Sequence, residues 1–304
     1  MENASQFLYF NLTMFVNIGP YRYPVFALCL LLYSFIVCAN LAIILVIIVK
    51  QSLHEPMYVF IACLSFNALY GSTGFFPRLL LDLMSDSHFI SRKACFTQIY
   101  FIYTYAANEM TTLGIMAYDR YVAVCHPLHY HAKMTTAKAM ALAALAWLFP
   151  AFVLTVCICL SASLPLCGNE IQKVFCANWN VVKLSCVPTL INNIVGMFLT
   201  ITTAFVPLVY VLYTYTRIVR ACWRCSDEFK GKAFQSCLSH VVTFVIFSIT
   251  AFCDIALSRY NLEEMNPFVA VILSLEFVVI PPFLNPLVYG MKLPEVRRHI
   301  LKML

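Results

Sequence analysis

One carboxylate stands out by its place in the sequence. Glu109 lies in the middle of the largely apolar stretch 95–121. If this stretch crosses a membrane as a helix, an unpaired carboxylate there costs about 2.5–3.5 kcal/mol, which makes Glu109 a candidate functional residue. Two chemistries fit equally: the carboxylate binds a cation, or it is protonated and hydrogen-bonded.

The same stretch ends in Asp119-Arg120-Tyr121. A half-buried guanidinium needs a partner, and the Asp119 carboxylate is one residue away. Release of that pair would free Arg120 to contact another protein. The simpler alternative is an ordinary charge pair at a membrane surface.

Polar residues near the end of the chain fit a conformational switch. In Asn285-Pro286-x-x-Tyr289, Pro286 removes a backbone hydrogen bond and permits a kink. The Asn285 and Tyr289 side chains can then exchange partners, and we expect Tyr215 to provide the opposite hydroxyl. For His240, a structural hydrogen bond and a switching role are both open.

We find no motif of an enzyme or a metal site. The sequence contains neither GxSxG nor HExxH. The segment Cys222-Trp223-Arg224-Cys225 has no second cysteine pair, and His126, His129 and His131 match no zinc spacing. We therefore expect no catalytic residue, no metal and no cofactor.

The composition indicates a membrane protein that is built from helices. Of the 304 residues, 62% are hydrophobic and 11% are charged, whereas soluble domains carry about 25% charged residues. Lipid requires helices or a closed barrel. Residues 25–49 contain no charge and are long enough to cross about 30 Å of hydrocarbon as a helix.

We expect an all-α bundle of seven spans in a single domain, residues 1–304. The second span contains Gly71, Gly74 and Pro77 and is predicted to be kinked. The predicted spans lie near 24–49, 57–83, 95–121, 138–160, 189–216, 233–257 and 267–290.

Charges and sequons predict the orientation in the plasma membrane. Most of the 20 Lys and Arg residues lie on one side, which the positive-inside rule places in the cytoplasm. The N-terminus is then extracellular, and it carries glycosylation sequons at Asn3 and Asn11. Anionic lipid explains the net charge of +6 without a nucleic-acid partner.

Four cysteines lie on the predicted outer side, where disulfides can form. They are Cys95, Cys167, Cys176 and Cys186. By sequence alone, three pairings of four cysteines are possible.

Several motifs together resemble the olfactory (odorant) receptor family of rhodopsin-like G-protein-coupled receptors. The most specific is the segment 116–128, which is close to the family signature MAYDRYVAIC-x-PL. Pro56-Met57-Tyr58, the segment 232–240 and the segment 281–290 match family motifs in the same order. The segment 67–71 resembles fish odorant receptors.

The resemblance implies a receptor that binds a small odorant and activates a stimulatory G protein, raising cyclic AMP. A non-olfactory rhodopsin-like receptor and a small-solute transporter are the alternatives. It also implies the disulfides Cys95–Cys176 and Cys167–Cys186, and a short cytoplasmic amphipathic helix over 292–302. The implied ligand-binding residues are Tyr103, Ala106, Ala107, Thr200, Thr203, Phe252, Ile255 and Arg259.

Some positions depart from the family pattern or leave alternatives open. Ala68 stands where the family usually has an Asp that could share a cation with Glu109. Arg259 could bind an acidic ligand through two hydrogen bonds. Equally, it could pair with Glu263 or Glu264 or reach toward the membrane surface.

Overall fold

The computed structural model describes residues 8–15, 21–223, 225–259 and 267–292. The predicted sequon at Asn3 lies outside these residues, and so does nearly all of the predicted helix 292–302. Asn11 lies within a strand and is partly exposed.

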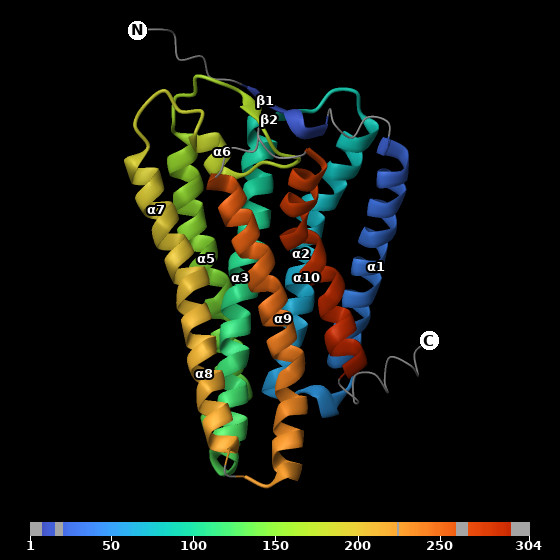
Figure 1. Ribbon diagram of the computed structural model, residues 1–304, viewed down its shortest axis with the longest axis vertical. Coiled ribbons are helices and arrows are strands. Elements are labelled where there is room, and N and C mark those ends of the chain that lie inside the picture. Colours follow the sequence, from blue (N-terminus) through green and yellow to red (C-terminus); the bar gives the residue numbers. More distant parts are fainter. Residues whose placement is uncertain (1–7, 16–20, 224, 260–266, 293–304) are drawn as a thin grey trace.

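Within the described residues, seven long helical rods run side by side (Figure 1). They extend somewhat beyond most of the predicted ranges. Their bounds are α1 Arg22–Val49, α2 Pro56–Met84, α3 Arg92–Cys125, α5 Thr136–Ala162, α7 Leu190–Thr200 continued by η4 Ile201–Phe205 and α8 Val206–Cys222, α9 Asp227–Arg259 and α10 Pro267–Lys292. The short helices are η2 Gln51–Leu53, η3 Pro127–His129, α4 Tyr130–Lys133 and α6 Asn178–Val182.

By length and composition, five of the seven described rods could cross a membrane, and α3 is the more informative of the two that fall short. The five are α1, α2, α5, α7–α8 and part of α9, and Leu275–Gly290 of α10 is a shorter apolar segment. The helix α3 does not meet the same measure. It packs against α2, α5, α8 and α9 in the middle of the bundle. Its polar side chains, such as Asn108 and Glu109, are buried against protein and do not face lipid.

A small sheet closes the end of the bundle near the N-terminus (Figure 1). Its central strand β1, Tyr9–Leu12, pairs antiparallel with β2, Phe89–Ser91, and parallel with β3, Glu170–Ile171. Phe10 and Leu12 are fully buried. This sheet is not predicted from the sequence. We call this end of the bundle the sheet end.

The fifth rod contains a π-helical turn, η4, at Ile201–Phe205. Pro207 follows it, and in an α-helix a proline lacks the N–H for a bond to the carbonyl four residues earlier and clashes with it. A wider π turn relieves that conflict. Pro207 also packs on α3, since a Cβ on Gly114 would come within 3.3 Å of its Cβ.

Two glycines allow α2 to pack closely on α3. A Cβ added at Gly71 would lie 2.4 Å from the Tyr105 ring, and one added at Gly74 would lie 2.3 Å from Phe101 Cβ. These atoms lie near the backbone of α3, so they cannot move away cheaply.

We therefore expect Gly74→Ala to reduce surface expression strongly, because overpacking costs about 1–3 kcal/mol. Flow cytometry of a surface-tagged receptor measures this effect. Gly231→Ala is the matched control, because a Cβ there meets nothing within 4 Å. Equal surface levels of the two variants would show that α2 and α3 can separate without cost.

Candidate ligand cavity and switch residues

Two small chambers lie between α3, the fifth rod and α9, and α6 lines one of them. Their volumes are about 120 and about 100 Å³. Both chambers are lined by Tyr103, Leu199, Thr200, Asp254 and Ile255.

Six of the eight predicted ligand-binding residues line these chambers. They are Tyr103, Ala106, Ala107, Thr200, Thr203 and Ile255. Phe252 does not line either chamber; its ring instead contacts Phe205 in the fifth rod, with centroids 5.5 Å apart. The side chain of Arg259 lies outside the described residues.

The two threonines use their hydroxyl protons within their own helix. Thr200 Oγ1 donates to the Gly196 carbonyl at 2.9 Å, and Thr203 Oγ1 donates to the Leu199 carbonyl at 2.8 Å. Each hydroxyl can therefore offer a chamber only its acceptor lone pairs.

A buried ion pair that the sequence analysis missed stands at the chambers. Lys173 Nζ, from the segment between β3 and α6, donates to Asp254 Oδ1 of α9 at 2.6 Å. The side chains are 0% and 7% exposed. Lys173 Nζ also lies 5.1 Å from the centroid of the Phe175 ring, a cation–π contact that adds to the pairing.

The segment that carries Lys173 is held over the bundle by a disulfide and a hydrogen bond. Cys95 is bonded to Cys176, and Cys167 to Cys186, the pairing that the resemblance implies. The backbone N–H of Cys176 donates to Gln98 Oε1 at 2.9 Å. The loop therefore closes the sheet end above the chambers.

Glu109 is fully buried and accepts hydrogen bonds from two amides. Asn67 Nδ2 donates to Oε2 at 2.8 Å, and Asn285 Nδ2 donates to Oε1 at 2.6 Å. The Asn67 amide also donates to the Tyr105 carbonyl at 2.9 Å. Asn67, one residue before Ala68, thus supplies a polar contact from α2 to Glu109.

At the opposite end of α3, Arg120 is paired with its neighbour. Its guanidinium donates to Asp119 Oδ2, from Nε at 3.0 Å and also from Nη2. Asp119 Oδ1 accepts from the Tyr130 hydroxyl at 2.8 Å. The Tyr121 ring lies edge-on against His126. Near the start of α9, Lys230 Nζ donates to Asp227 Oδ1 at 3.0 Å, so this lysine is paired within its own helix. Asp119 thus holds the Arg120 guanidinium, which is the group that we predict to contact a partner protein.

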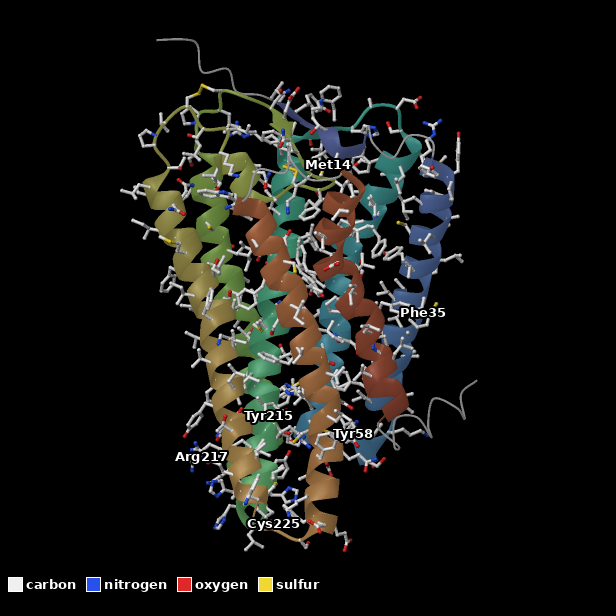
Figure 2. The ribbon with its side chains drawn as sticks, viewed as in Figure 1. Met14, Phe35, Tyr58, Tyr215, Arg217 and Cys225 are labelled. Atoms are coloured by element: carbon white, nitrogen blue, oxygen red, sulfur yellow. A yellow bond between two sulfur atoms is a disulfide. The ribbon has the colours of Figure 1, made fainter. Side chains whose placement is uncertain are left out.

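His240 joins three rods. The carbonyl of Leu113 can only accept, so His240 Nε2 donates to it at 2.8 Å, and Nδ1 accepts from the Tyr215 hydroxyl at 2.6 Å. This pattern requires the neutral imidazole and supports a structural role in this state. Tyr215 lies in the half of the bundle away from the sheet end (Figure 2), while Pro286 and Tyr289 are buried in α10.

The described residues contain no group of three or more His, Cys, Asp or Glu side chains that could hold a metal ion. Polar groups of the site are paired between different segments of the chain: Glu109 and His240 with residues of other helices, and Asp254 with Lys173 of the loop.

A helical membrane bundle with a disulfide-held loop over two ligand-sized chambers is the architecture of seven-helix receptors. The family model of olfactory receptors matches residues 28–304. Human olfactory receptor 10A3 is 33% identical over 99% of this chain and 96% of its own length. Human olfactory receptors 6N1 and 51E1 are 35% and 32% identical, over 99% and 91% of this chain and 96% and 87% of their own lengths.

The chain therefore belongs to the olfactory receptor family. Members of this family are multi-pass G-protein-coupled receptors and not enzymes, so the chain is an odorant receptor. Membership of this family excludes the alternative of a small-solute transporter.

Proposed function

We propose that an odorant binds in the two chambers and that the receptor then activates a stimulatory G protein, which raises cyclic AMP. The observation that carries this proposal is the pair of chambers beneath the disulfide-held loop, lined by α3 and α9. The receptor acts in the plasma membrane with its N-terminus outside, and Asn3 and Asn11 are its glycosylation sites.

The coupling residues lie on the rods that line the chambers. The helix α3 runs from the chambers to Asp119-Arg120-Tyr121, and α9 carries both Asp254 and His240. A ligand that shifts α9 relative to α3 acts on the His240 bond to Leu113. Because a ligand shifts an equilibrium only by its differential affinity for the two states, these contacts must differ between the states. We propose that Asn285, Pro286 and Tyr289 allow α10 to follow this movement.

We propose that Glu109 acts as a hydrogen-bonded carboxyl group. Its two oxygens already accept from neutral amides, and Ala68 removes the second carboxylate that would help to bind a cation. We expect Glu109→Gln to reach the surface and to signal, because glutamine can keep one acceptor oxygen. Replacing external sodium by N-methylglucamine should leave the wild-type cyclic AMP response unchanged. A sodium-dependent response that Glu109→Gln abolishes would demonstrate a cation site.

That the ligand is acidic stays a prediction, because it depends on Arg259, whose side chain lies outside the described residues. If Arg259 binds a carboxylate, Arg259→Ala should raise the half-maximal concentration of an acid at least about tenfold relative to its methyl ester. Arg259→Lys should rescue only part of the loss, since a point charge cannot form the bidentate pair. Concentration–response curves for cyclic AMP measure both. Equal shifts for the acid and the ester would mean that Arg259 is structural.

A further inference from the structure

The Lys173–Asp254 pair presents only one of its members to the ligand chambers. Asp254 lines both chambers, whereas Lys173 is fully buried and lines neither. The Lys173 ammonium group lies 2.6 Å from the Asp254 carboxylate and balances its charge. The surface that faces the ligand is thus a carboxylate whose charge is already balanced.

Charge balance disfavours a charged ligand at this position. An ammonium ligand would add a second cation beside Lys173, and a carboxylate ligand would face Asp254. In a chamber of low dielectric constant each case leaves one buried charge uncompensated, which is costly. An uncharged ligand leaves the pair balanced.

The hydrogen-bonding groups of the chambers favour a ligand that donates a hydrogen bond. An ionised carboxylate has about four acceptor positions, so Asp254 can accept a ligand proton while it stays bonded to Lys173. Thr200 and Thr203 donate to their own helix and offer acceptor lone pairs. Tyr103, which lines both chambers, carries a hydroxyl that can donate or accept.

We propose that the chambers select uncharged ligands with a hydroxyl group, small alcohols or phenols, whose proton is donated to Asp254. Lys173 is the positioning residue that holds this carboxylate and balances its charge. The inference rests on the proposed function, since it names the ligand class of the same chambers.

The test is a panel on two carbon skeletons in cells that express the intact receptor. Hexan-1-ol, hexyl methyl ether, hexylamine and hexanoic acid form one series; benzyl alcohol, benzyl methyl ether, benzylamine and benzoic acid form the other. We expect the alcohol to activate at a half-maximal concentration at least about tenfold below that of the ether, because the ether lacks the donated hydrogen bond to a charged group. Amines and acids should be weaker than the alcohols.

The outcomes separate this inference from the proposed function. Ethers as potent as alcohols, or amines more potent than both, would overturn the inference and leave the receptor function standing. Acids as the strongest class, with their advantage lost in Arg259→Ala, would support the acidic-ligand prediction instead. No response to any compound, in cells whose adenylyl cyclase responds to forskolin, would count against the proposed function as well.

A reversed pair gives a second, independent test. Asp254→Asn alone leaves Lys173 buried beside a neutral amide, so we expect loss of surface receptor. The double variant Lys173→Asp with Asp254→Lys keeps an ion pair but presents a donor to the chambers. We expect it to recover surface receptor and to respond to ethers at least as well as to alcohols. Lys183→Asp, an exposed residue of the same loop, is the control. An unchanged preference for alcohols in the reversed variant would overturn the proposal.

Discussion

Cells that express Arg120→Ala should show no ligand-stimulated rise in cyclic AMP, while the receptor still reaches the surface. Arg120 lies at the end of α3 away from the chambers, so its removal should leave ligand binding unchanged, and Asp119 then keeps the hydrogen bond from the Tyr130 hydroxyl. The Arg120 side chain is 11% exposed, and its guanidinium donates to Asp119 Oδ2. Loss of the guanidinium removes the cation that we propose contacts the G protein.

The matched comparison is Arg120→Lys, which keeps the charge but cannot form two parallel hydrogen bonds to one carboxylate. We expect it to signal weakly and with raised basal activity, because the pair with Asp119 is loosened. Cyclic AMP is measured at equal surface level, with forskolin as the positive control. Full signalling by Arg120→Ala under these conditions would disprove the coupling assignment.

The second large effect is expected at the disulfide that holds the loop. Cys95→Ser should cause the receptor to be retained inside the cell. Both Cys95 and Cys176 are fully buried, and the bond anchors the segment that carries Lys173. Loss of a native disulfide costs about 2–5 kcal/mol in small secreted domains. The freed loop would also expose the buried ion pair to water.

Surface staining and peptide mapping measure this effect. Cys159→Ser is the control, because Cys159 is an exposed free cysteine on α5. We expect the control to reach the surface at the wild-type level. Detection of Cys95 as a free thiol in the wild-type receptor would refute the pairing.

The fold and the coupling motif could be predicted because their signals are local. An uncharged run such as 25–49 specifies a membrane helix without knowledge of its neighbours. Asp119 and Arg120 are adjacent in the chain, so their pairing needs no tertiary information. Glu109 could be singled out because a carboxylate inside a membrane helix has few explanations, although its partners could not be named.

The parts that were missed depend on contacts between distant segments. Lys173 and Asp254 are 81 residues apart, and only the conformation of the loop brings them together. In the sequence, Lys173 is only one of several basic residues on the predicted outer side. Asn67 donates to Glu109 from the position before Ala68, and a comparison with the family pattern position by position does not reveal this bond.

The sheet and the position of Phe252 illustrate two further reasons why parts of the structure could not be predicted from the sequence. Strand β1 has four residues and pairs with two short segments from distant loops. A strand this short shows no hydrophobic periodicity that would predict it. Phe252 was placed at the ligand by family geometry. In the structure it packs on Phe205 of the π-helical turn, whose wider geometry reflects the proline at position 207.

The central claim, that an odorant acts from the two chambers, is tested most directly by filling one of them. Gly196 lines a chamber, and a Cβ at this position would meet no atom within 4 Å, so Gly196→Leu should place its side chain there without strain. Phe198→Leu, at a residue of the same helix that is 51% exposed, is the control. The measurement is the concentration–response curve for cyclic AMP with the most potent alcohol of the panel, at matched surface levels. We expect Gly196→Leu to lose the response or to need at least tenfold more ligand, on the order of 1.4 kcal/mol, while Phe198→Leu behaves as wild type. A Gly196→Leu receptor with the wild-type curve would contradict the claim that these chambers hold the odorant.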